Sequence, residues 1–294
     1  MDTNTLQAFV AVAEARSFSK AAERLYLTQS AMSKRIATLE DQLGSKLFDR
    51  IGRRISLTEA GLSLLPRARD LLLQLDDAKR AIGNLTEGVV TGTLSLAASH
   101  HISLHRLPPF LREFSESCPK VELDLQFAES EVAYEGVLKG DLELALITLS
   151  PEPDASICSE IIWDDLLHYV VANEHPLAQS SQVSLEELTA VNAILPGSNT
   201  FTRSLVEKLF KQHELELNVT MSTNYLDTIR MMVSIGLGWS LLPESLIGDD
   251  LTILNVDSEP VHRNLGIIFH RNRTLSNAAN YLVELLRSSR EKCE

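Results

Sequence analysis

Residues 1–27 alternate apolar and polar positions at helical spacing. The apolar positions of the first segment share one face of a predicted helix, and they are Leu6, Phe9, Val10 and Ala13. A second, short helix is predicted with Ser19 as its cap and with Ala22 and Leu25 facing inward. A tight connection at Tyr26 and Leu27 follows. The pattern therefore predicts two helices before residue 28.

A third helix is predicted to begin after a Thr28 cap and to end at Gly44. Its inward face carries apolar residues at intervals of four, three and four, namely Met32, Ile36, Leu39 and Leu43. Its opposite face carries short or hydrogen-bonding side chains near the helix start, namely Gln29, Ser30, Ser33, Lys34 and Ala37. Small residues permit close approach to a duplex, Gln can read a base edge, and a helix N-terminus favours phosphate. A solvated face would more often carry Glu–Lys pairs, so we interpret this segment as the recognition helix of a helix-turn-helix.

Residues 47–58, LFDRIGRRISLT, predict a short hairpin with its turn at Gly52. Arg50, Arg53 and Arg54 surround that turn. Such cations can lie over phosphates or enter the minor groove, which is how a wing contacts DNA. The alternative interpretation is that the three arginines are simple surface charge.

From Thr58 onward, apolar or small residues recur at steps of three and four for more than three heptads. The seam consists of Gly61, Leu64, Ala68, Leu71, Leu75, Ala78, Ile82 and Leu85. One interpretation is a helix buried against its own domain. The regular seam favours a partner helix instead, and we predict that Leu64, Leu71, Leu75, Ile82 and Leu85 form a dimer contact. Residues 86–92, TEGVVTG, are typical of a hinge.

Beyond residue 91 the chain alternates strand-like and helix-like segments in two successive sets. The first runs to about residue 160, and the second includes the strands 168–172, 192–196, 217–223 and 265–270 and closes with an amphipathic helix at 275–291. Alternating strands and helices predict a parallel sheet covered by helices. The residues after 91 are therefore expected to form two α/β lobes.

Small polar residues follow several of these predicted strands. They are Ser99, His100, Ser130, Thr148, Ser198, Asn199 and Thr200. In open α/β sheets ligands bind beyond the carboxyl ends of the strands, where helix N-termini converge. Each residue taken alone could simply cap a helix, but together they predict a pocket for a carboxylate or another small anion. Arg203, Asn224 and Tyr225 are weaker candidates, while His101 and His105 are expected at the surface.

Charge is divided unevenly along the chain. The formal net charge is −13, yet residues 1–60 hold nine Lys and Arg against seven Asp and Glu. The remaining residues hold 18 against 33, so a small basic module precedes an acidic body. No apolar run reaches the roughly 18 to 20 residues of a membrane span. The start carries Asp2 and no basic segment, so no signal peptide is predicted and a cytoplasmic location is expected.

The sequence offers few of the residues or motifs that metalloproteins, enzymes, transport proteins or RNA-binding proteins require. Cys118, Cys158 and Cys293 are widely spaced, which favours reduced thiols over a disulfide framework or a zinc site, with a Cys118–Cys158 redox pair left open. No metal site or cofactor is expected. The nucleophile elbow, the P-loop and the zinc-protease motif of enzymes are all missing. A solute-binding transport protein would need export, and an RNA- or nucleoid-binding protein would need a broader positive surface.

The N-terminal residues quoted above also carry a family signature. From Phe9 to Gly61 the chain reads F-x-x-V-A-E-x-x-S-F-S-x-A-A-x-x-L-x-x-T-Q-S-A-x-S-x-x-I-x-x-L-E-x-x-L-G-x-x-L-F-x-R-x-x-R-x-x-x-L-T-x-A-G, which resembles the LysR-type transcriptional regulators. The phrases GDLELAL, NEHPLA, SLEEL and GLGWSLLP extend the resemblance over nearly the whole chain. The resemblance implies that Gln29, Ser33, Lys34 and Arg35 meet DNA, with Arg53 and Arg54 in the wing.

The resemblance also implies a domain order and partners. Residues 1–58 would form a winged helix-turn-helix and 59–88 a coiled-coil linker helix. Residues 89–294 would form a two-lobed α/β effector domain of the periplasmic-binding-protein type, with lobe I at about 92–160 and 267–294 and lobe II at about 161–266. The expected partners are a DNA dyad, a small effector, a second copy of the chain in a homodimer or homotetramer, and, as a further candidate, RNA polymerase.

Overall fold

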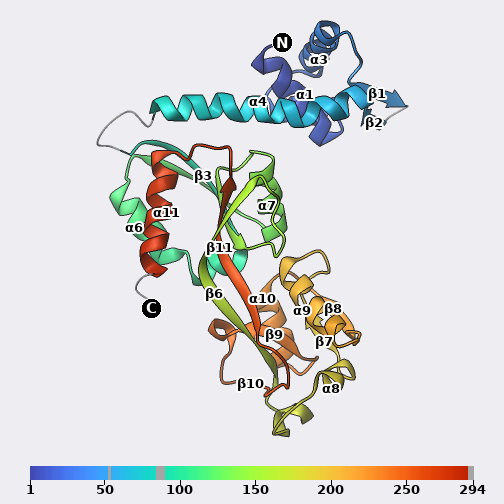
Figure 1. The fold of residues 1–294 in the computed structure, drawn as a ribbon, viewed down its shortest axis with the longest axis vertical. Coiled ribbons are helices and arrows are strands. Elements are labelled where there is room, and N and C mark those ends of the chain that lie inside the picture. The colour runs from blue at the N-terminus through green and yellow to red at the C-terminus, as the bar shows by residue number, and fades with distance from the viewer. Residues whose placement is uncertain (52–53, 84–89, 291–294) are drawn as a thin grey trace. The chain divides into compact units, whose positions relative to one another are not determined.

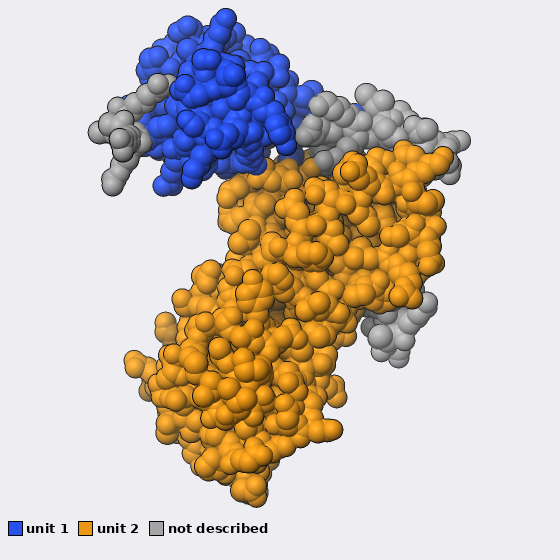
Figure 2. Space-filling model, turned by 180° about the vertical axis from the view of Figure 1, so that it is seen from behind, with its two compact units in different colours: residues 1–85 blue, residues 86–294 orange. Residues whose placement is uncertain are grey.

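The computed structural model describes residues 1–51, 54–83 and 90–290. The chain divides into two compact units, Met1–Leu85 and Thr86–Glu294, which Figure 2 colours separately. Each unit has hydrophobic clusters of its own. The predicted boundaries at 58 and 88 stay a prediction, as do the residue limits of the two lobes.

The first unit consists of three short helices, a hairpin and a long helix (Figure 1). Its elements are α1 (Thr3–Ala15), α2 (Phe18–Arg24), α3 (Gln29–Leu43), β1 (Phe48–Ile51), β2 (Arg54–Leu57) and α4 (Glu59–Gly83). Strands β1 and β2 pair antiparallel, and the predicted turn at Gly52 lies outside the described residues. This arrangement is the predicted helix-turn-helix followed by a hairpin.

The predicted ends of the third helix are confirmed. The Thr28 hydroxyl accepts a hydrogen bond from the backbone N–H of Ala31, and Gly44 ends α3 with a positive φ of 64°. Two details of the sequence prediction were wrong. Ser17, rather than Ser19, caps α2. Leu43 is exposed, because the buried face of α3 ends at Leu39 and Glu40.

Helix α4 divides into two parts with different surroundings. Ala68 is fully buried in the core of the first unit, and Leu64 packs against the same core. Farther along, Leu71 and Leu75 remain 43% and 38% exposed. The beginning of the predicted seam therefore packs within the chain, and only its later part offers exposed leucines. The side chain of Ile82 and all of Leu85 lie outside the described residues.

The first lobe of the second unit is built on three parallel strands, with β3 between β4 and β5. Helices α6 and α11 lie on one side of this sheet and α7 on the other (Figure 1). The elements are β3 (Gly92–Ala98), α5 (His100–His105), α6 (Pro108–Ser117), β4 (Val121–Phe127), α7 (Ser130–Leu138), β5 (Leu144–Thr148) and α11 (Asn277–Arg290). This lobe agrees with the predicted parallel sheet.

The second lobe contains the shorter strands and the remaining helices. They are a 3-10 turn (Pro176–Gln179), α8 (Leu185–Thr189), β7 (Ala193–Leu195), α9 (Phe201–Gln212), β8 (Val219–Ser222), α10 (Leu226–Ser234), β9 (Ser240–Pro243), a second 3-10 turn (Glu244–Leu246) and β10 (Leu251–Ile253). Strands β7 and β8 pair parallel, whereas β9 and β10 pair antiparallel with β6 (Ile157–Ala172). Its core centres on Trp239, whose indole N–H donates to the carbonyl of Leu188.

Two long strands run through both lobes and join them: β6 (Ile157–Ala172) and β11 (Val261–His270) (Figure 1). They pair antiparallel with each other along ten residues of β11, and β11 also pairs antiparallel with β5. The predicted parallel pairing therefore holds for β3, β4 and β5 but is wrong for β6 and β11. The physical reason is that strands which pass from one lobe to the other in opposite directions must pair antiparallel.

Candidate functional site

The start of α3 presents the polar face that the sequence predicted. Gln29, Ser30 and Lys34 are exposed, while Ser33 and Arg35 are partly buried. The Gln29 amide donates a hydrogen bond of 3.2 Å to the Ser33 hydroxyl. The Gln29 amide is thereby positioned while it stays accessible from outside. This surface has the short, hydrogen-bonding side chains that a helix in the major groove requires.

The hairpin follows α3 and is held to it by a residue that the sequence analysis did not single out. The Glu40 carboxylate accepts the N–H of Leu47 at 2.9 Å and the Lys46 ammonium at 2.7 Å. Burial alone would raise the pKa of Glu40, but these two partners outweigh it and lower that pKa. Arg50 and Arg54 belong to β1 and β2, although their side chains, and all of Arg53, lie outside the described residues.

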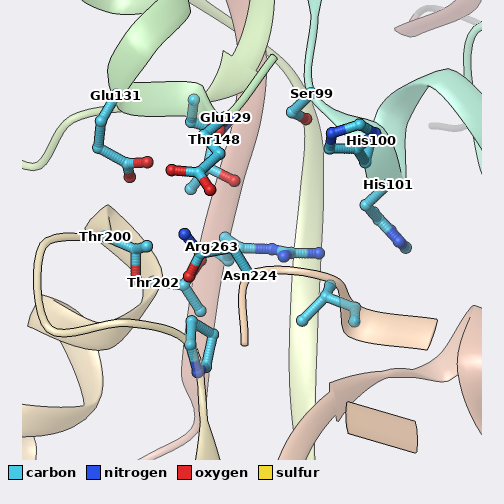
Figure 3. Close-up of a pocket in the computed structure, with 13 residues that line it drawn as sticks. Ser99, His100, His101, Glu129, Glu131, Thr148, Thr200, Thr202, Asn224 and Arg263 are labelled. Carbon is cyan, nitrogen blue, oxygen red and sulfur yellow. Dashed lines mark hydrogen bonds between the residues drawn. The ribbon is translucent and has the colours of Figure 1, made fainter. Parts of the chain in front are cut away.

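A pocket lies in the second unit where the two lobes meet (Figure 3). The space open to the centres of water molecules is about 60 Å³. Its lining comes from both lobes and from β11, and consists of Ser99, His100, His101, Glu129, Ser130, Glu131, Thr148, Pro196, Thr200, Thr202, Asn224, Leu226 and Arg263. Helices α7, α9 and α10 begin at or next to lining residues, so their positive N-terminal ends converge on this space.

The structure brings five of the predicted ligand-binding residues together: Ser99, His100, Ser130, Thr148 and Thr200. It does not bring Ser198 and Asn199 to the lining. Both are exposed, because the loop turns so that Thr200 caps α9, with its hydroxyl accepting the N–H of Arg203. Asn224, a weaker candidate in the sequence, lines the pocket, and its side-chain oxygen accepts the N–H of Gly197.

Several lining hydroxyls keep their hydrogen-bonding capacity. Those of Ser99, Thr148 and Thr202 make no hydrogen bond within the described part of the chain. The Ser130 hydroxyl accepts the N–H of Thr148 at 3.1 Å and retains its own proton as a donor. The pocket therefore offers a set of neutral donors of the kind that recognise an anion.

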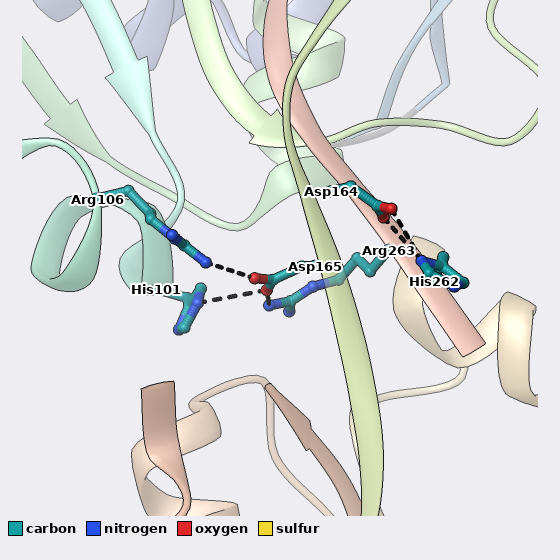
Figure 4. Close-up of polar contacts among 6 residues, drawn as sticks. All are labelled: His101, Arg106, Asp164, Asp165, His262 and Arg263. Carbon is teal, nitrogen blue, oxygen red and sulfur yellow. Dashed lines mark hydrogen bonds and ion pairs between the residues drawn. The ribbon is translucent and has the colours of Figure 1, made fainter. Parts of the chain in front are cut away.

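Sequence reasoning missed a buried ionic cluster at the same place (Figure 4). Arg263 on β11 and Asp165 on β6 form an ion pair, and Arg106 donates to the other oxygen of Asp165 at 2.8 Å. His101, expected at the surface, is buried with Nε2 3.6 Å from Asp165. A signal was present, since Asp164 and Asp165 interrupt an apolar run. The prediction of strand 168–172 began too late to include them.

The cluster changes the protonation of its members. Burial by itself would raise the pKa of the Asp165 carboxyl, yet the interaction with His101 and the charge of Arg263 outweigh it and hold that pKa well below its usual range. For His101, burial is the main cause of a lowered pKa. Asp165 is therefore ionised and His101 neutral at neutral pH.

Contacts between the lobes flank the pocket. Glu131, in the first turn of α7, accepts the N–H of Phe201 at the start of α9 at 2.6 Å. The rings of His100 and Tyr225 are in tilted contact with centroids 4.8 Å apart, and His105 lies 3.6 Å from Asp227. These contacts connect helices of the first lobe to the starts of helices of the second lobe at the edge of the pocket.

Three further findings concern metal binding, membrane crossing and the cysteines. Within residues 1–51, 54–83 and 90–290, no three or more His, Cys, Asp or Glu side chains are placed to hold a metal ion. None of the described helices combines the length and the apolar character that crossing a membrane requires. Cys118 is buried, which raises the pKa of its thiol, and both Cys118 and Cys158 are free thiols. A redox pairing between them stays untested, and Cys293 lies outside the described residues.

Comparison with known proteins agrees with this architecture. The family model described as the LysR substrate binding domain matches residues 87–291. The model described as a bacterial regulatory helix-turn-helix protein of the lysR family matches residues 3–62. The HTH-type transcriptional activator CmpR of Synechocystis sp. is 30% identical, over 95% of this chain and 93% of that protein.

Solved structures show the same fold. A full-length OxyR variant from Pseudomonas aeruginosa aligns with a TM-score of 0.70 at 22% identity, covering 98% of each chain. Full-length CbnR complexed with its target DNA aligns with a TM-score of 0.59 at 25% identity, covering 98% of this chain and 100% of that chain. With both domain models matched in order, the chain belongs to the LysR family of DNA-binding transcriptional regulators with a C-terminal effector-binding domain.

Proposed function

We propose that this regulator is controlled by a small effector, carrying an anionic group, that binds in the pocket between the two lobes. One observation carries the proposal: a pocket lined from both lobes holds the unsatisfied hydroxyls of Ser99, Thr148 and Thr202. Hydroxyl donors beside converging helix N-termini stabilise negative charge. The protein would act through binding rather than catalysis.

The same proposal assigns the DNA contacts. Gln29, Ser30, Ser33, Lys34 and Arg35 on α3 would read the major groove, and Arg50, Arg53 and Arg54 of the hairpin would hold the phosphates. The acidic second unit would reduce nonspecific attachment to DNA, because like charges repel. The relative CbnR, in the complex with its target DNA, supports the assignment of DNA as the partner.

Control by the effector would pass through lobe movement. Contacts such as Glu131 with Phe201 link the lobes beside the pocket, so an effector that bridges the lobes would shift their separation. We propose that α4 pairs with α4 of a second copy, so that two recognition helices reach two half-sites of a dyad. The assembly would be a dimer or a tetramer, and RNA polymerase is a further candidate partner.

The first experiment retains sheared genomic DNA on the purified full-length protein, at low and at raised salt, and sequences what is bound. We expect a small set of sites that share a dyad and that remain bound at raised salt. Uniform retention that salt removes would contradict sequence-specific regulation.

A second experiment tests the pocket. The double variant Ser99→Ala/Thr148→Ala should keep operator binding and lose the response to the effector that the neighbouring genes suggest. A variant with Ser103→Ala, on α5 but outside the pocket lining, is the matched control. An unchanged effector response in the double variant would place the effector elsewhere.

A further inference from the structure

The charged groups that line the pocket are not equivalent. The positive charge of Arg263 is already paired with the carboxylate of Asp165. Glu131 is also engaged, since its carboxylate accepts the N–H of Phe201. Glu129 differs from both, because its side chain has no hydrogen bond or ion pair with any described residue. The pocket therefore contains one partly buried carboxylate without a partner.

The position of Glu129 places its side chain at the pocket. Glu129 is the N-cap residue of α7, a position where short side chains such as Asp, Asn, Ser and Thr usually cap the helix. Here its side chain makes no capping hydrogen bond. Its carboxylate is directed into the pocket instead, beside that of Glu131 (Figure 3). A partly buried carboxylate loses hydration, and a cationic partner would compensate that loss.

Donors belong to the same lining. Ser99 and Thr148 carry free hydroxyls at the ends of β3 and β5, and Thr148 lies next to the start of α7, because its backbone N–H donates to the Ser130 hydroxyl. Arg263 is only 3% exposed, and its Nε is buried without a hydrogen-bond partner among the described residues, beside the same space. The pocket thus presents, in one lining, a carboxylate that can pair with a cation and unsatisfied donors for an anion.

We propose that the effector is a zwitterion, namely an α-amino acid or another small amino-carboxylate. Its ammonium group would pair with Glu129, and its carboxylate would bind the hydroxyls of Ser99 and Thr148. This inference rests on the proposed function of the pocket and narrows its ligand class. The space open to the centres of water molecules is about 60 Å³, which favours a compact ligand. A ligand with only anionic groups would lie beside Glu129 and be repelled by it.

The test uses the full-length protein and a matched panel of probes: L-α-amino acids, the 2-oxo acids with the same side chains, and the corresponding primary amines. Binding to the native state raises the thermal midpoint, which tryptophan fluorescence can follow because Trp163 and Trp239 both lie in the second unit. Titration calorimetry then gives the affinity. At least one amino acid should stabilise the protein, while its oxo-acid and amine analogues should bind at least tenfold more weakly.

Variants test the assigned residue. Glu129→Gln should weaken binding of the amino acid by roughly 10- to 100-fold, the range for loss of a charged hydrogen bond. It should also improve relative binding of the 2-oxo acid, because the repelling charge is removed. Glu135→Gln, an exposed residue on the same helix, is the control and should change neither affinity. A purely structural effect of Glu129 would weaken both probes alike.

Each remaining outcome contradicts the proposal. Suppose that 2-oxo acids bind as tightly as amino acids and that Ser99→Ala/Thr148→Ala abolishes their binding. The hypothesis of a zwitterionic effector is then wrong, while the proposal of an anion-binding pocket is supported. If no amino acid binds, the zwitterion is likewise wrong, and the pocket is then judged by the effector response of the double variant. Equal amino-acid affinity in wild type and Glu129→Gln would remove Glu129 from the site.

Discussion

Arg263 and Asp165 are direct cross-strand neighbours on β11 and β6, and each side chain is 3% exposed. The two residues lie 98 positions apart in the sequence, on the two strands that join the lobes. Their ion pair is buried beside the pocket, where Arg106 adds a further hydrogen bond to Asp165. A charge removed here leaves another charge buried and uncompensated.

Asp165→Asn should therefore destabilise the second unit by about 3–5 kcal/mol at neutral pH. Because the folded-state pKa of Asp165 is lowered, its contribution is present above the unfolded pKa of about 4 and is lost as the pH falls below it. The gap between wild type and variant should thus shrink by roughly 1 kcal/mol per pH unit below about pH 4. Urea unfolding followed by tryptophan fluorescence measures it.

A matched control lies at the adjacent position. Asp164 pairs with His262 at 2.9 Å, but both side chains are about half exposed. Asp164→Asn should change the free energy of unfolding by less than about 1 kcal/mol, since solvent screens such pairs. If Asp164→Asn and Asp165→Asn lowered the free energy of unfolding equally, burial would not explain the contribution of the Asp165 cluster to stability.

Gln29→Ala should cost roughly 1–3 kcal/mol in binding to the operator and should relax base preference at one position of each half-site. The reason is that Gln29 is exposed at the start of α3, where a base edge would be read. Fluorescence anisotropy with operator and base-substituted duplexes gives the comparison. Gln42→Ala, exposed near the other end of α3, should bind like wild type. Normal discrimination by Gln29→Ala would exclude Gln29 as a reading residue.

Arg53→Ala should weaken binding to operator and random DNA alike, because a phosphate contact carries no sequence information. The slope of log affinity against log salt should fall by about 1. The measurement is a salt series with both duplexes. Arg112→Ala, an exposed arginine on α6, provides the reference. A loss confined to the operator would indicate a base contact instead.

Leu71→Glu should shift the protein from dimer towards monomer, because a charge would replace an apolar side chain at the proposed contact between copies of α4. Leu71 is 43% exposed in the single chain, so its substitution should disturb the fold of one copy little. Sedimentation velocity over a range of concentrations reports the assembly. Gln74→Glu adds the same charge at an exposed position of α4 and should leave the dimer intact.

Glu131→Ala should speed hydrogen exchange at the start of α9, where the Phe201 N–H would lose its acceptor. Glu131→Gln keeps an acceptor oxygen and should retain much of the protection. Mass spectrometry of peptides that cover residues 200–206 measures the rate, with Glu135→Ala as the control on the same helix. Wild-type exchange in Glu131→Ala would mean that the lobes do not make this contact in solution.

Local signals explain why some elements were predictable. Thr28 and Gly44 mark the ends of α3 because a capping hydroxyl and a left-handed glycine act within a few residues. Five members of the pocket were predicted from small polar residues that follow strands. That prediction works because the carboxyl ends of strands are where ligands bind in open α/β sheets. Ser19 was wrong by two residues, the usual uncertainty of an element's end, whereas Leu43 was wrong about burial although the end of α3 was right.

Long-range pairing explains what was missed. Nothing in the local pattern around Asp165 shows that Arg263 lies opposite it, because strand register joins residues far apart in the chain. Likewise, the sequence does not distinguish Glu129 from Glu131, which are two residues apart. One carboxylate is engaged by α9 of the other lobe and the other is free. Only the packing of the lobes creates that difference.

The sequence by itself determined the family, the helix-turn-helix with its polar reading face, and the alternation of strands and helices in the acidic body. These follow from residue spacing and capping, which act over short distances. The tertiary structure decided the antiparallel crossing of β6 and β11, the buried Asp165 cluster and the division of charge within the pocket. Those depend on which distant segments meet, and burial then sets the cost of every charge that has no partner.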